Sequence, residues 1–297
     1  MDYEYEGSAV QGLIDSYDRD EEAFMKSSGE DFSEIIHEMR AINLLKEILF
    51  PKYWSCGPIE SNNFDSKLEK KIEAIGKEFA SGIAPYFSDK TKIKEIVEET
   101  IDKFPEIREK LKKDVRAAYK GDPAAKSYTE IIRSYPGFLA IEVQRVAHVL
   151  YKEGASEYAR ELMEFVHSRT GIDIHPGAQI GEYFFIDHGT GVVVGESATI
   201  GEWVRIYQDV TLGTLHFEEE KEKGLLRKGY KRHPDIGDHV VIGAGAKVLG
   251  AIDIGDHVNI GANAWVTENV PSNTKVYVAE HPRLEKKPKQ KENSGEE

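Results

Sequence analysis

A six-residue period in the second half of the chain restricts the fold more than any other feature. Aliphatic or small residues occupy every sixth position on both sides of one interruption. These positions are Ile174, Ile180, Ile186, Val192, Ala198, Val204 and Val210 before it, and Ile236, Ile242, Val248, Ile254, Ile260 and Val266 after it. Such a period is typical of a parallel β-helix, in which short strands turn corners and stack coil on coil, and not of a β-sandwich. Three hexads would close one triangular coil, so the repeats predict about four coils.

Glycine residues follow this repeat closely. A turn with positive φ would favour glycine directly after the repeated aliphatic residue, as at Gly181, Gly237, Gly243, Gly255 and Gly261. Residues 1–170 hold 9 of the 26 glycines, whereas residues 171–270 hold 16. Because each interior glycine costs a helix about 1 kcal/mol relative to alanine, the second region is not expected to be helical.

The first half of the chain instead shows helical periodicity. Apolar residues from Ile35 to Leu49 recur at spacings of three and four, and Ser88 is expected to cap another helix. We therefore expect an α+β chain, in which an all-α region precedes a parallel β-helix with one extruded loop at 214–231. The expected parts are an acidic extension at 1–30, an α-helical domain at 31–170, the β-helix domain at 171–284 and a charged tail at 285–297.

Charge and cysteine content exclude several classes of function. The 297 residues carry a formal net charge of −14, and residues 1–30 alone contribute −7. Nucleic-acid binding requires clustered Lys and Arg, so no nucleic-acid partner is expected. The single Cys56 cannot form an intrachain disulfide, which fits a reducing compartment and favours the cytoplasm. No leader opens the chain and no apolar run approaches roughly 18 residues, so no membrane association is expected.

Residues that depart from the repeat are the candidates for chemistry. Asp187 and His188 occupy a corner that the repeat would normally fill with glycine and a small residue. A neutral histidine whose second ring nitrogen is held by a carboxylate is a common general base near neutral pH. Asp173 lies slightly less than one coil earlier in the chain and could reach the same face from the coil below. The pattern alone fits a corner-filling histidine equally well.

Two further motifs have both a structural and a functional interpretation. Arg232-His233-Pro234 ends the extruded loop, where an arginine could bind a carboxylate through a two-pronged ion pair or simply anchor the loop. Asp122-Pro123 is typical of a helix N-cap followed by proline at the first helical position.

Taken together, these residues resemble the hexapeptide-repeat acyltransferases, and most closely the serine O-acetyltransferase family. The matching motifs are Asp173-Ile-His-Pro-Gly-Ala-Gln-Ile-Gly181, Asp187-His-Gly-Thr-Gly-Val-Val-Val-Gly-Glu196, Val210-Thr-Leu-Gly213, Arg232-His-Pro234, Ile242-Gly-Ala-Gly-Ala-Lys-Val-Leu-Gly250, and Asp122-Pro123 upstream of Tyr-Pro-Gly-Phe138. Many acyltransferases share the hexad, but the Asp-His-Gly-Thr-Gly string combined with a helical N-terminal domain and Arg-His-Pro is far more specific. The resemblance implies that the β-helix is left-handed.

The resemblance also implies a reaction and its residues. The chain would transfer the acetyl group of acetyl-CoA to the hydroxyl of L-serine, giving O-acetylserine for cysteine biosynthesis without a covalent acyl-enzyme. His188 would be the general base, Asp173 would hold its imidazole, and His233 would approach the reacting centre from the facing subunit. The substrate ammonium would be bound by Asp122 and Asp187, and its carboxylate by Arg232.

Cofactor and assembly are implied in the same way. Acetyl-CoA would lie along the β-helix between subunits, where Gly213, Ala244 and Gly245 permit close approach and Lys247 meets a phosphate. A homotrimer is expected, with two trimers paired through the helical halves. Family members dock into cysteine synthase with a C-terminal Ile, which Ser294-Gly-Glu-Glu297 lacks, so that complex is not expected.

Other functions remain open on the sequence alone. A related hexapeptide enzyme could acetylate a sugar or another hydroxy-compound. A carbonic anhydrase on the same kind of β-helix would need three converging zinc ligands, of which the motifs offer two histidines. A non-catalytic scaffold is the third alternative. The acyltransferase resemblance implies no metal.

Overall fold

The computed structural model describes residues 36–54, 64–220 and 224–279. The predicted acidic extension, Cys56 and the charged tail lie outside these residues. The described chain divides into two compact units, one within Met1–Lys103 and Leu150–Glu161, the other within Phe104–Val149 and Leu162–Glu297. Among the described residues no helix is long and apolar enough to cross a membrane.

The first unit is built from helices. They are α2 (Ile36–Leu49), α3 (Pro51–Trp54), α4 (Phe64–Ile83), the 3-10 helix η2 (Ala84–Tyr86) and α5 (Lys90–Asp102). Leu45, Phe79 and Tyr158 are fully buried in its core, where the Phe79 and Tyr158 rings meet edge to face. Asp89, and not the predicted Ser88, caps α5, because its side chain accepts the N–H groups of Thr91 and Lys92.

Four helices lie wholly or partly in the second unit. They are α6 (Phe104–Gly121), α7 (Tyr128–Ser134), α8 (Pro136–Lys152) and α9 (Ser156–Thr170). A buried ion pair between Asp114 of α6 and Arg145 of α8 ties this layer to the first coil of the β-helix. Arg145 donates to the carbonyls of Ile180 and Gly181, and Asp114 accepts the Phe184 N–H, so every charged group there has a partner.

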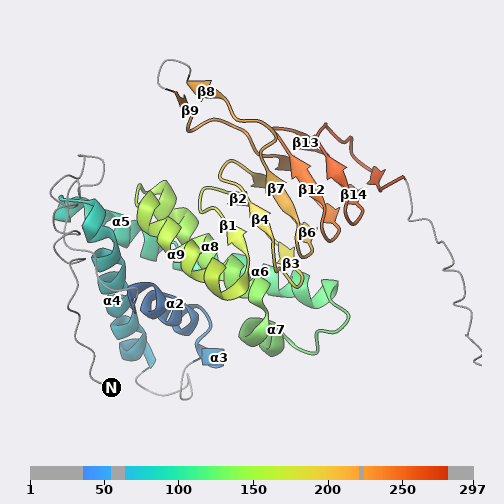
Figure 1. The fold of residues 1–297 in the computed structure, drawn as a ribbon. Helices are drawn as coiled ribbons and strands as arrows, with labels where there is room; N and C mark the ends of the chain where they lie inside the picture. The colour runs from blue at the N-terminus through green and yellow to red at the C-terminus, as the bar shows by residue number, and fades with distance from the viewer. Residues whose placement is uncertain (1–35, 55–63, 221–223, 280–297) are drawn as a thin grey trace, which may run out of the picture. The chain divides into compact units, whose positions relative to one another are not determined.

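The second unit continues as a parallel β-helix with three sheets, as the hexads predict, and it agrees with the left-handed β-helix that the family resemblance implies (Figure 1). The first sheet holds β1 (Asp173–Ile174), β4 (Val193–Val194), β7 (Thr211–Gly213), β12 (Lys247–Leu249) and β15 (Trp265–Val266). The second holds β2 (Gln179–Ile180), β5 (Thr199–Ile200), β10 (Asp235–Ile236) and β13 (Asp253–Ile254). The third holds β3 (Phe185–Ile186), β6 (Arg205–Ile206), β11 (Val241–Ile242), β14 (Asn259–Ile260) and β16 (Lys275–Val276). Between β7 and β10 the extruded loop forms an antiparallel hairpin, β8 (Glu219–Glu220) with β9 (Leu225–Leu226).

One corner changes the register of the repeat. After the extruded loop, Asp235 pairs with Asp253, exactly three hexads further along the chain, as predicted. In the first coil the repeat predicts that Asp173 pairs with Gly191, three hexads further along the chain. The structure pairs Asp173 with Val193 instead, because the corner between β3 and β4 holds two residues more than a regular corner. The predicted register is therefore wrong by two residues between β4 and β7. The sequence predicted the strand residues as Val192, Ala198, Val204 and Val210. The structure places in the strands Val194, Ile200, Ile206 and Leu212. Both sets are buried, so apolarity alone does not distinguish them.

The glycines that directly follow the repeated aliphatic residues serve close packing and not positive φ. None of these glycines has a left-handed backbone: Gly181, Gly237, Gly243, Gly255 and Gly261. Non-glycine residues take the left-handed conformation instead, including His188, His239 and His257. A Cβ on Gly181 would lie 2.6 Å from the carbonyl oxygen of Gly201 in the next coil, and one on Gly243 would lie 2.6 Å from the Ala262 nitrogen. The predicted reason for these glycines was thus wrong, and the spacing between coils supplies the correct one.

Candidate functional site

The long corner between β3 and β4 presents His188 to solvent. The residue has a left-handed backbone (φ 59°), and its side chain is 70% exposed. Gly189 and Gly191 on either side of Thr190 also have positive φ, and a Cβ on Gly189 would lie 2.4 Å from Cδ1 of Ile172. The Nε2 atom of His188 lies 3.8 Å from Oδ1 of Asp187, which is mostly buried. An accessible imidazole beside a carboxylate is suited to proton transfer.

A second carboxylate belongs to the same region. Asp122 follows the end of α6, and its Oδ1 accepts the Ala124 N–H at 2.7 Å. The hydroxyl of Tyr135 donates to Oδ2 at 2.5 Å. This hydrogen bond lowers the pKa of Asp122, with smaller contributions from His188 and Arg205. Burial and the same hydrogen bond raise the pKa of Tyr135.

The structure therefore gathers Asp122, Tyr135, Asp187 and His188 into one group, which we call the acidic corner. Its two carboxylates and exposed imidazole provide negative charge next to a proton acceptor. Such a group can bind an ammonium and deprotonate a nearby hydroxyl.

A different group lies where the extruded loop rejoins the β-helix. The Nη2 atom of Arg232 donates to Oε2 of Glu196 at 2.7 Å, and the Arg232 N–H donates to the Ser197 hydroxyl oxygen. Ser197 also accepts the backbone N–H of His233, so the Arg-His dipeptide is held at two successive nitrogens. We call Glu196, Ser197, Arg232 and His233 the arginine corner.

His233 is held in one protonation state within this corner. Its side chain is buried, with the residue only 6% exposed, and its ring packs where a Cβ on Gly195 would lie 2.1 Å away. The backbone N–H of Ser197 donates to Nδ1 at 3.1 Å, which places the ring proton on Nε2. Desolvation, followed by the charge of Arg232, lowers the pKa of His233 to about 4. At neutral pH His233 is therefore a neutral hydrogen-bond donor.

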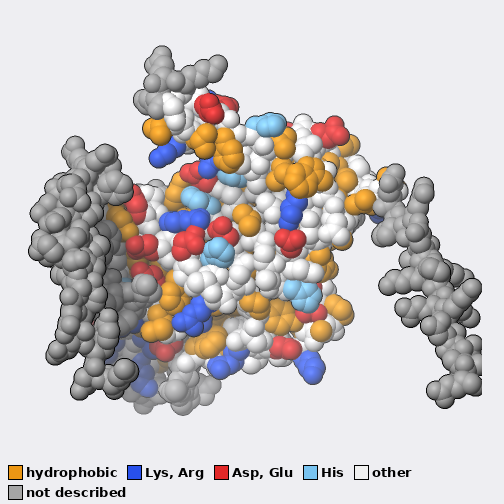
Figure 2. All heavy atoms as spheres, in the orientation of Figure 1, with side chains coloured by type: hydrophobic (Ala, Val, Ile, Leu, Met, Phe, Trp, Pro, Cys, Tyr) orange, Lys and Arg blue, Asp and Glu red, His pale blue; other side chains and the backbone are white. Residues whose placement is uncertain are grey.

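The two groups occupy opposite ends of one strand. The corner that carries His188 leads into β4, and Gly195 and Glu196 directly follow β4. The residues expected to surround one substrate therefore lie at two successive corners of the β-helix, one before β4 and one after it. The space-filling view shows histidine, acidic and basic side chains close together on one face of the β-helix (Figure 2).

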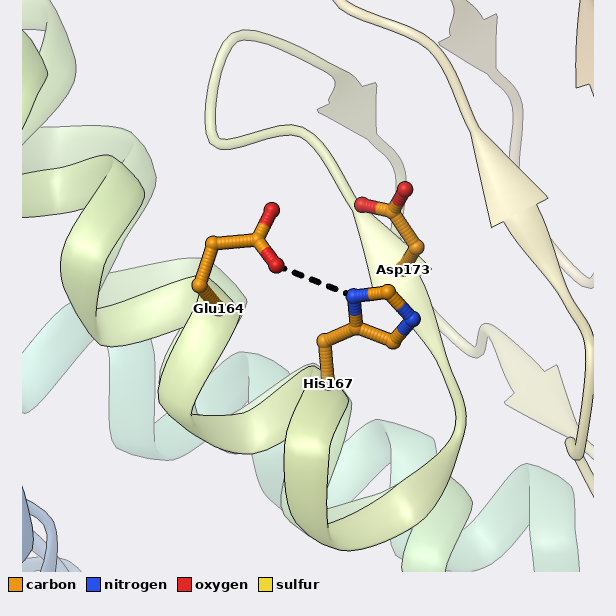
Figure 3. A group of neighbouring side chains, drawn as sticks. All are labelled: Glu164, His167 and Asp173. Atoms are coloured by element: carbon orange, nitrogen blue, oxygen red, sulfur yellow. Dashed lines mark hydrogen bonds and ion pairs between the residues drawn. The ribbon is translucent and has the colours of Figure 1, made fainter.

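Asp173 has neighbours that the sequence did not suggest. It lies on β1, and its carboxylate faces Glu164 and His167 of α9 (Figure 3). One ligand atom from each of these three side chains lies within 4.8 Å of the others, and Glu164 Oε2 is 3.0 Å from His167 Nδ1. The group contains one histidine and not the three that a carbonic anhydrase would need. The expected role of Asp173 in holding His188 stays a prediction.

The expected cofactor residues lie along β7, β12 and the corner before β12. Gly245 has a φ of 74°, and a Cβ there would lie 2.3 Å from Oδ1 of Asn263. Ala244 precedes it, and Gly213 pairs with Leu249 across the two strands. Lys247 donates to Oδ1 of Asp209 at 2.8 Å, so a cofactor phosphate would compete with this carboxylate. Their binding of CoA stays a prediction.

Comparisons with known proteins decide the family. The family described as "Serine acetyltransferase, N-terminal" matches residues 68–143, and the six-repeat bacterial transferase hexapeptide family matches residues 233–268. Serine acetyltransferase isoform 3 of Entamoeba histolytica, solved with cysteine, has a TM-score of 0.76 and 43% identity over 95% of this chain and 94% of that chain. The chain belongs to the serine acetyltransferase family.

Two other serine acetyltransferases extend the comparison. The plasmid enzyme of Synechococcus elongatus is 52% identical over 177 residues, which cover 60% of this chain and 55% of that relative. The chain thus spans about half the length of that curated relative. A serine acetyltransferase solved in complex with CoA has a TM-score of 0.53 and 30% identity, over 81% of this chain and 95% of that chain. The family's members are acyltransferases, so the resemblance, the fold class and the enzyme class predicted from the sequence are confirmed.

The sequence alone did not point to three of the site residues. Tyr135 was noticed only as part of a family motif, although its hydroxyl orients Asp122. Glu196 had no assigned role, and the structure gives it the Arg232 guanidinium as a partner. Ser197 carried no signal, because it lies just beyond the motif that ends at Glu196.

Proposed function

We propose that this chain transfers the acetyl group of acetyl-CoA to the hydroxyl of L-serine. The observation that carries the proposal is the acidic corner, where an exposed His188 lies beside Asp187 and near the anionic Asp122. The family membership and the CoA complex of a structural neighbour support acetyl-CoA as the acetyl donor. The product would be O-acetylserine, a precursor for cysteine biosynthesis.

His188 is the proposed general base. Its imidazole accepts the proton of the serine hydroxyl while that oxygen attacks the thioester carbonyl carbon of acetyl-CoA. A C–O bond forms, the tetrahedral intermediate collapses with loss of the C–S bond, and the CoA sulfur leaves with the proton from His188. The carboxylate of Asp173 orients the imidazole and stabilises its charged form. No covalent acyl-enzyme is needed, because both substrates react directly in a ternary complex.

Serine is held by its two charged groups. The lowered pKa of Asp122 keeps its carboxylate ionised, so Asp122 and Asp187 bind the substrate ammonium. Arg232 binds the substrate carboxylate through its guanidinium, which Glu196 orients. Neutral His233 donates from Nε2 towards the reacting centre, where a hydrogen bond stabilises the developing negative charge.

The position of these groups supports a site shared between subunits. Because the acidic corner and the arginine corner lie at opposite ends of β4, one substrate is enclosed when a second copy supplies the missing corner. A homotrimer of parallel β-helices provides three such sites, with acetyl-CoA along Gly213, Ala244, Gly245 and Lys247. Pairing of two trimers and a cytoplasmic location are further parts of this proposal.

A test of substrate choice is direct. Purified protein is incubated with acetyl-CoA and, separately, with L-serine, homoserine and several sugars, while release of CoA thiol is followed. We expect turnover with serine to exceed turnover with every sugar. Release with a sugar but not with serine would assign the chain to another hexapeptide O-acetyltransferase. Full activity after exhaustive chelation is expected. Zinc-dependent hydration of carbon dioxide without any release of CoA thiol would instead favour the carbonic anhydrase alternative.

A further inference from the structure

We propose that Glu164, His167 and Asp173 form a binding site for a divalent transition metal ion such as Zn²⁺. The three side chains come from two elements, helix α9 and strand β1, and meet on one side of the β-helix entry (Figure 3). Neither the family description nor the reaction proposed above uses Glu164 or His167. The ion would not be a cofactor of acetyl transfer.

The residue types suit such an ion. Glu164 and His167 have the Glu-x-x-His spacing, which places two ligands on one face of a helix, as in carboxylate-bridged metal sites. Carboxylate oxygen and imidazole nitrogen are both ligands of Zn²⁺ and its first-row neighbours. Two carboxylates balance the charge of a dication, and solvent can supply the remaining coordination position.

The geometry is close to what coordination requires. Ligands held at about 2.1 Å from an ion lie about 3–3.5 Å from one another. Glu164 and His167 already meet this condition with 3.0 Å between Oε2 and Nδ1, and a carboxylate oxygen of Asp173 lies within 4.8 Å of one possible ligand atom of each. The side chains of Glu164 and His167 are 45% and 42% exposed, so small rotations can close the remaining gap. Asp173 is fixed at its backbone by the β1–β4 pairing, which makes it the anchor of the site.

A bound ion would have a consequence for catalysis that rests on the proposed function. Asp173 is the carboxylate proposed to orient His188. An ion that coordinates this carboxylate competes with the imidazole for it, and acetyl transfer slows. We therefore expect the site to make the enzyme sensitive to Zn²⁺.

Metal binding is measured without substrates on the full chain. Zn²⁺ is titrated against a chromophoric chelator, and Co²⁺ is added separately to record its visible absorption. We expect the wild-type chain to bind one ion at this site, and His167→Ala and Glu164→Gln each to weaken that binding at least tenfold. His216→Ala removes an exposed histidine of the extruded loop and should bind as the wild type does. Unchanged Zn²⁺ affinity in both His167→Ala and Glu164→Gln, with circular dichroism showing intact folding, would overturn the site.

Inhibition is measured next, by thioester absorbance, because Zn²⁺ binds the thiols that a thiol assay detects. We expect Zn²⁺ to slow the wild type and to leave His167→Ala, which keeps Asp173, at least tenfold less sensitive. Equal inhibition of both proteins would overturn the link to Asp173. The titration needs no activity, so a chain that failed to acetylate serine would still give a decisive result on the metal site.

Discussion

Two histidines at opposite ends of strand β4 show how one fold can prepare the same side chain for different tasks. His188 is 70% exposed at its side chain, on a left-handed corner beside Asp187. His233 is buried and held at Nδ1 by Ser197, and its pKa is lowered to about 4. An exposed imidazole beside a carboxylate can accept a proton, whereas the buried imidazole next to Arg232 stays neutral, accepts from Ser197 at Nδ1 and donates from Nε2. Burial and neighbouring charge, not residue type, separate a base from a donor.

The largest effect is expected from removal of the exposed histidine. His188→Ala should lower kcat by about 10²–10⁴-fold, as loss of a general base does, with little change in thermal unfolding. The matched control is His239→Ala, because His239 is also exposed and also has a φ of 59°. Thiol release with serine measures both variants. Activity of His188→Ala within twofold of the wild type would contradict the assignment of the base.

Mixed assemblies test whether the two corners meet across subunits. His188→Ala and Arg232→Ala chains, each nearly inactive, are co-expressed with different tags and the mixed assemblies are purified. If each site combines the acidic corner of one chain with the arginine corner of the next, one site in three of a mixed trimer, or about a quarter of the sites in randomly mixed pairs of trimers, regains both wild-type corners. Activity should therefore rise to between about a quarter and a third of the wild-type value. No recovery in verified mixed assemblies would place each site within a single chain.

Displacing the buried histidine should have an intermediate effect. Gly195→Ala puts a Cβ 2.1 Å from the His233 ring, so the ring or the strand must move. Overpacking of this kind costs about 1–3 kcal/mol, and we expect kcat/KM for serine to fall roughly tenfold to a hundredfold. Gly76→Ala in α4 is the control, because its Cβ would meet only ordinary contacts at 3.6 Å. Equal activity of the two variants would contradict a role for His233.

A smaller effect is expected on the acidic corner. Tyr135→Phe removes the hydrogen bond to Asp122, which is worth about 1.5 kcal/mol for a charged acceptor, so KM for serine should rise roughly tenfold with kcat nearly unchanged. Without the Tyr135 hydrogen bond the pKa of Asp122 should also rise. On acidification, KM for serine should therefore begin to increase at a higher pH in Tyr135→Phe than in the wild type. Tyr128→Phe, at an exposed tyrosine, is the control. A lower kcat at constant KM would instead indicate a role for Tyr135 in the chemical step.

The smallest effect concerns stability. An unfolded histidine has a pKa of about 6.5, whereas folding lowers the pKa of His233 to about 4. As the pH falls, the unfolded chain therefore takes up a proton at His233 before the folded chain does. The contribution of His233 to the free energy of unfolding is therefore complete above pH 6.5 and falls as the pH decreases towards 4. His233→Gln should flatten this part of the stability curve, measured by thermal unfolding against pH. An unchanged slope would show that His233 titrates normally in the folded chain.

Much of the fold could be predicted because burial in a β-helix repeats. Each coil needs apolar residues at equivalent positions, so residues such as Ile242 and Ile260 reveal the stacking directly. The register from Val192 to Val210 could not be predicted, since two apolar residues per strand are buried and the period does not say which one pairs. The corner glycines were found, but their reason depends on the neighbouring coil.

The candidate site was predicted as a set of residues and not as an arrangement. Motif strings identified His188, Asp122, Arg232 and His233, but a string gives no distance between residues far apart in sequence. The Tyr135 hydrogen bond and the Glu196 ion pair join residues 13 and 36 positions apart. Asp173 was expected beside His188, and its described neighbours include Glu164 and His167.

The sequence by itself determined the β-helix, the helical first half and the family, because repeat spacing and motif strings are properties of the linear chain. Only the tertiary structure decided that His188 is exposed on a corner lengthened by two residues, that Ser197 fixes the His233 proton, and that the two corners lie at opposite ends of β4. The physical reason is that proton positions and charge pairing depend on distances and burial. The distances and burial of these side chains are set only when the regular coils and the lengthened coil stack on one another.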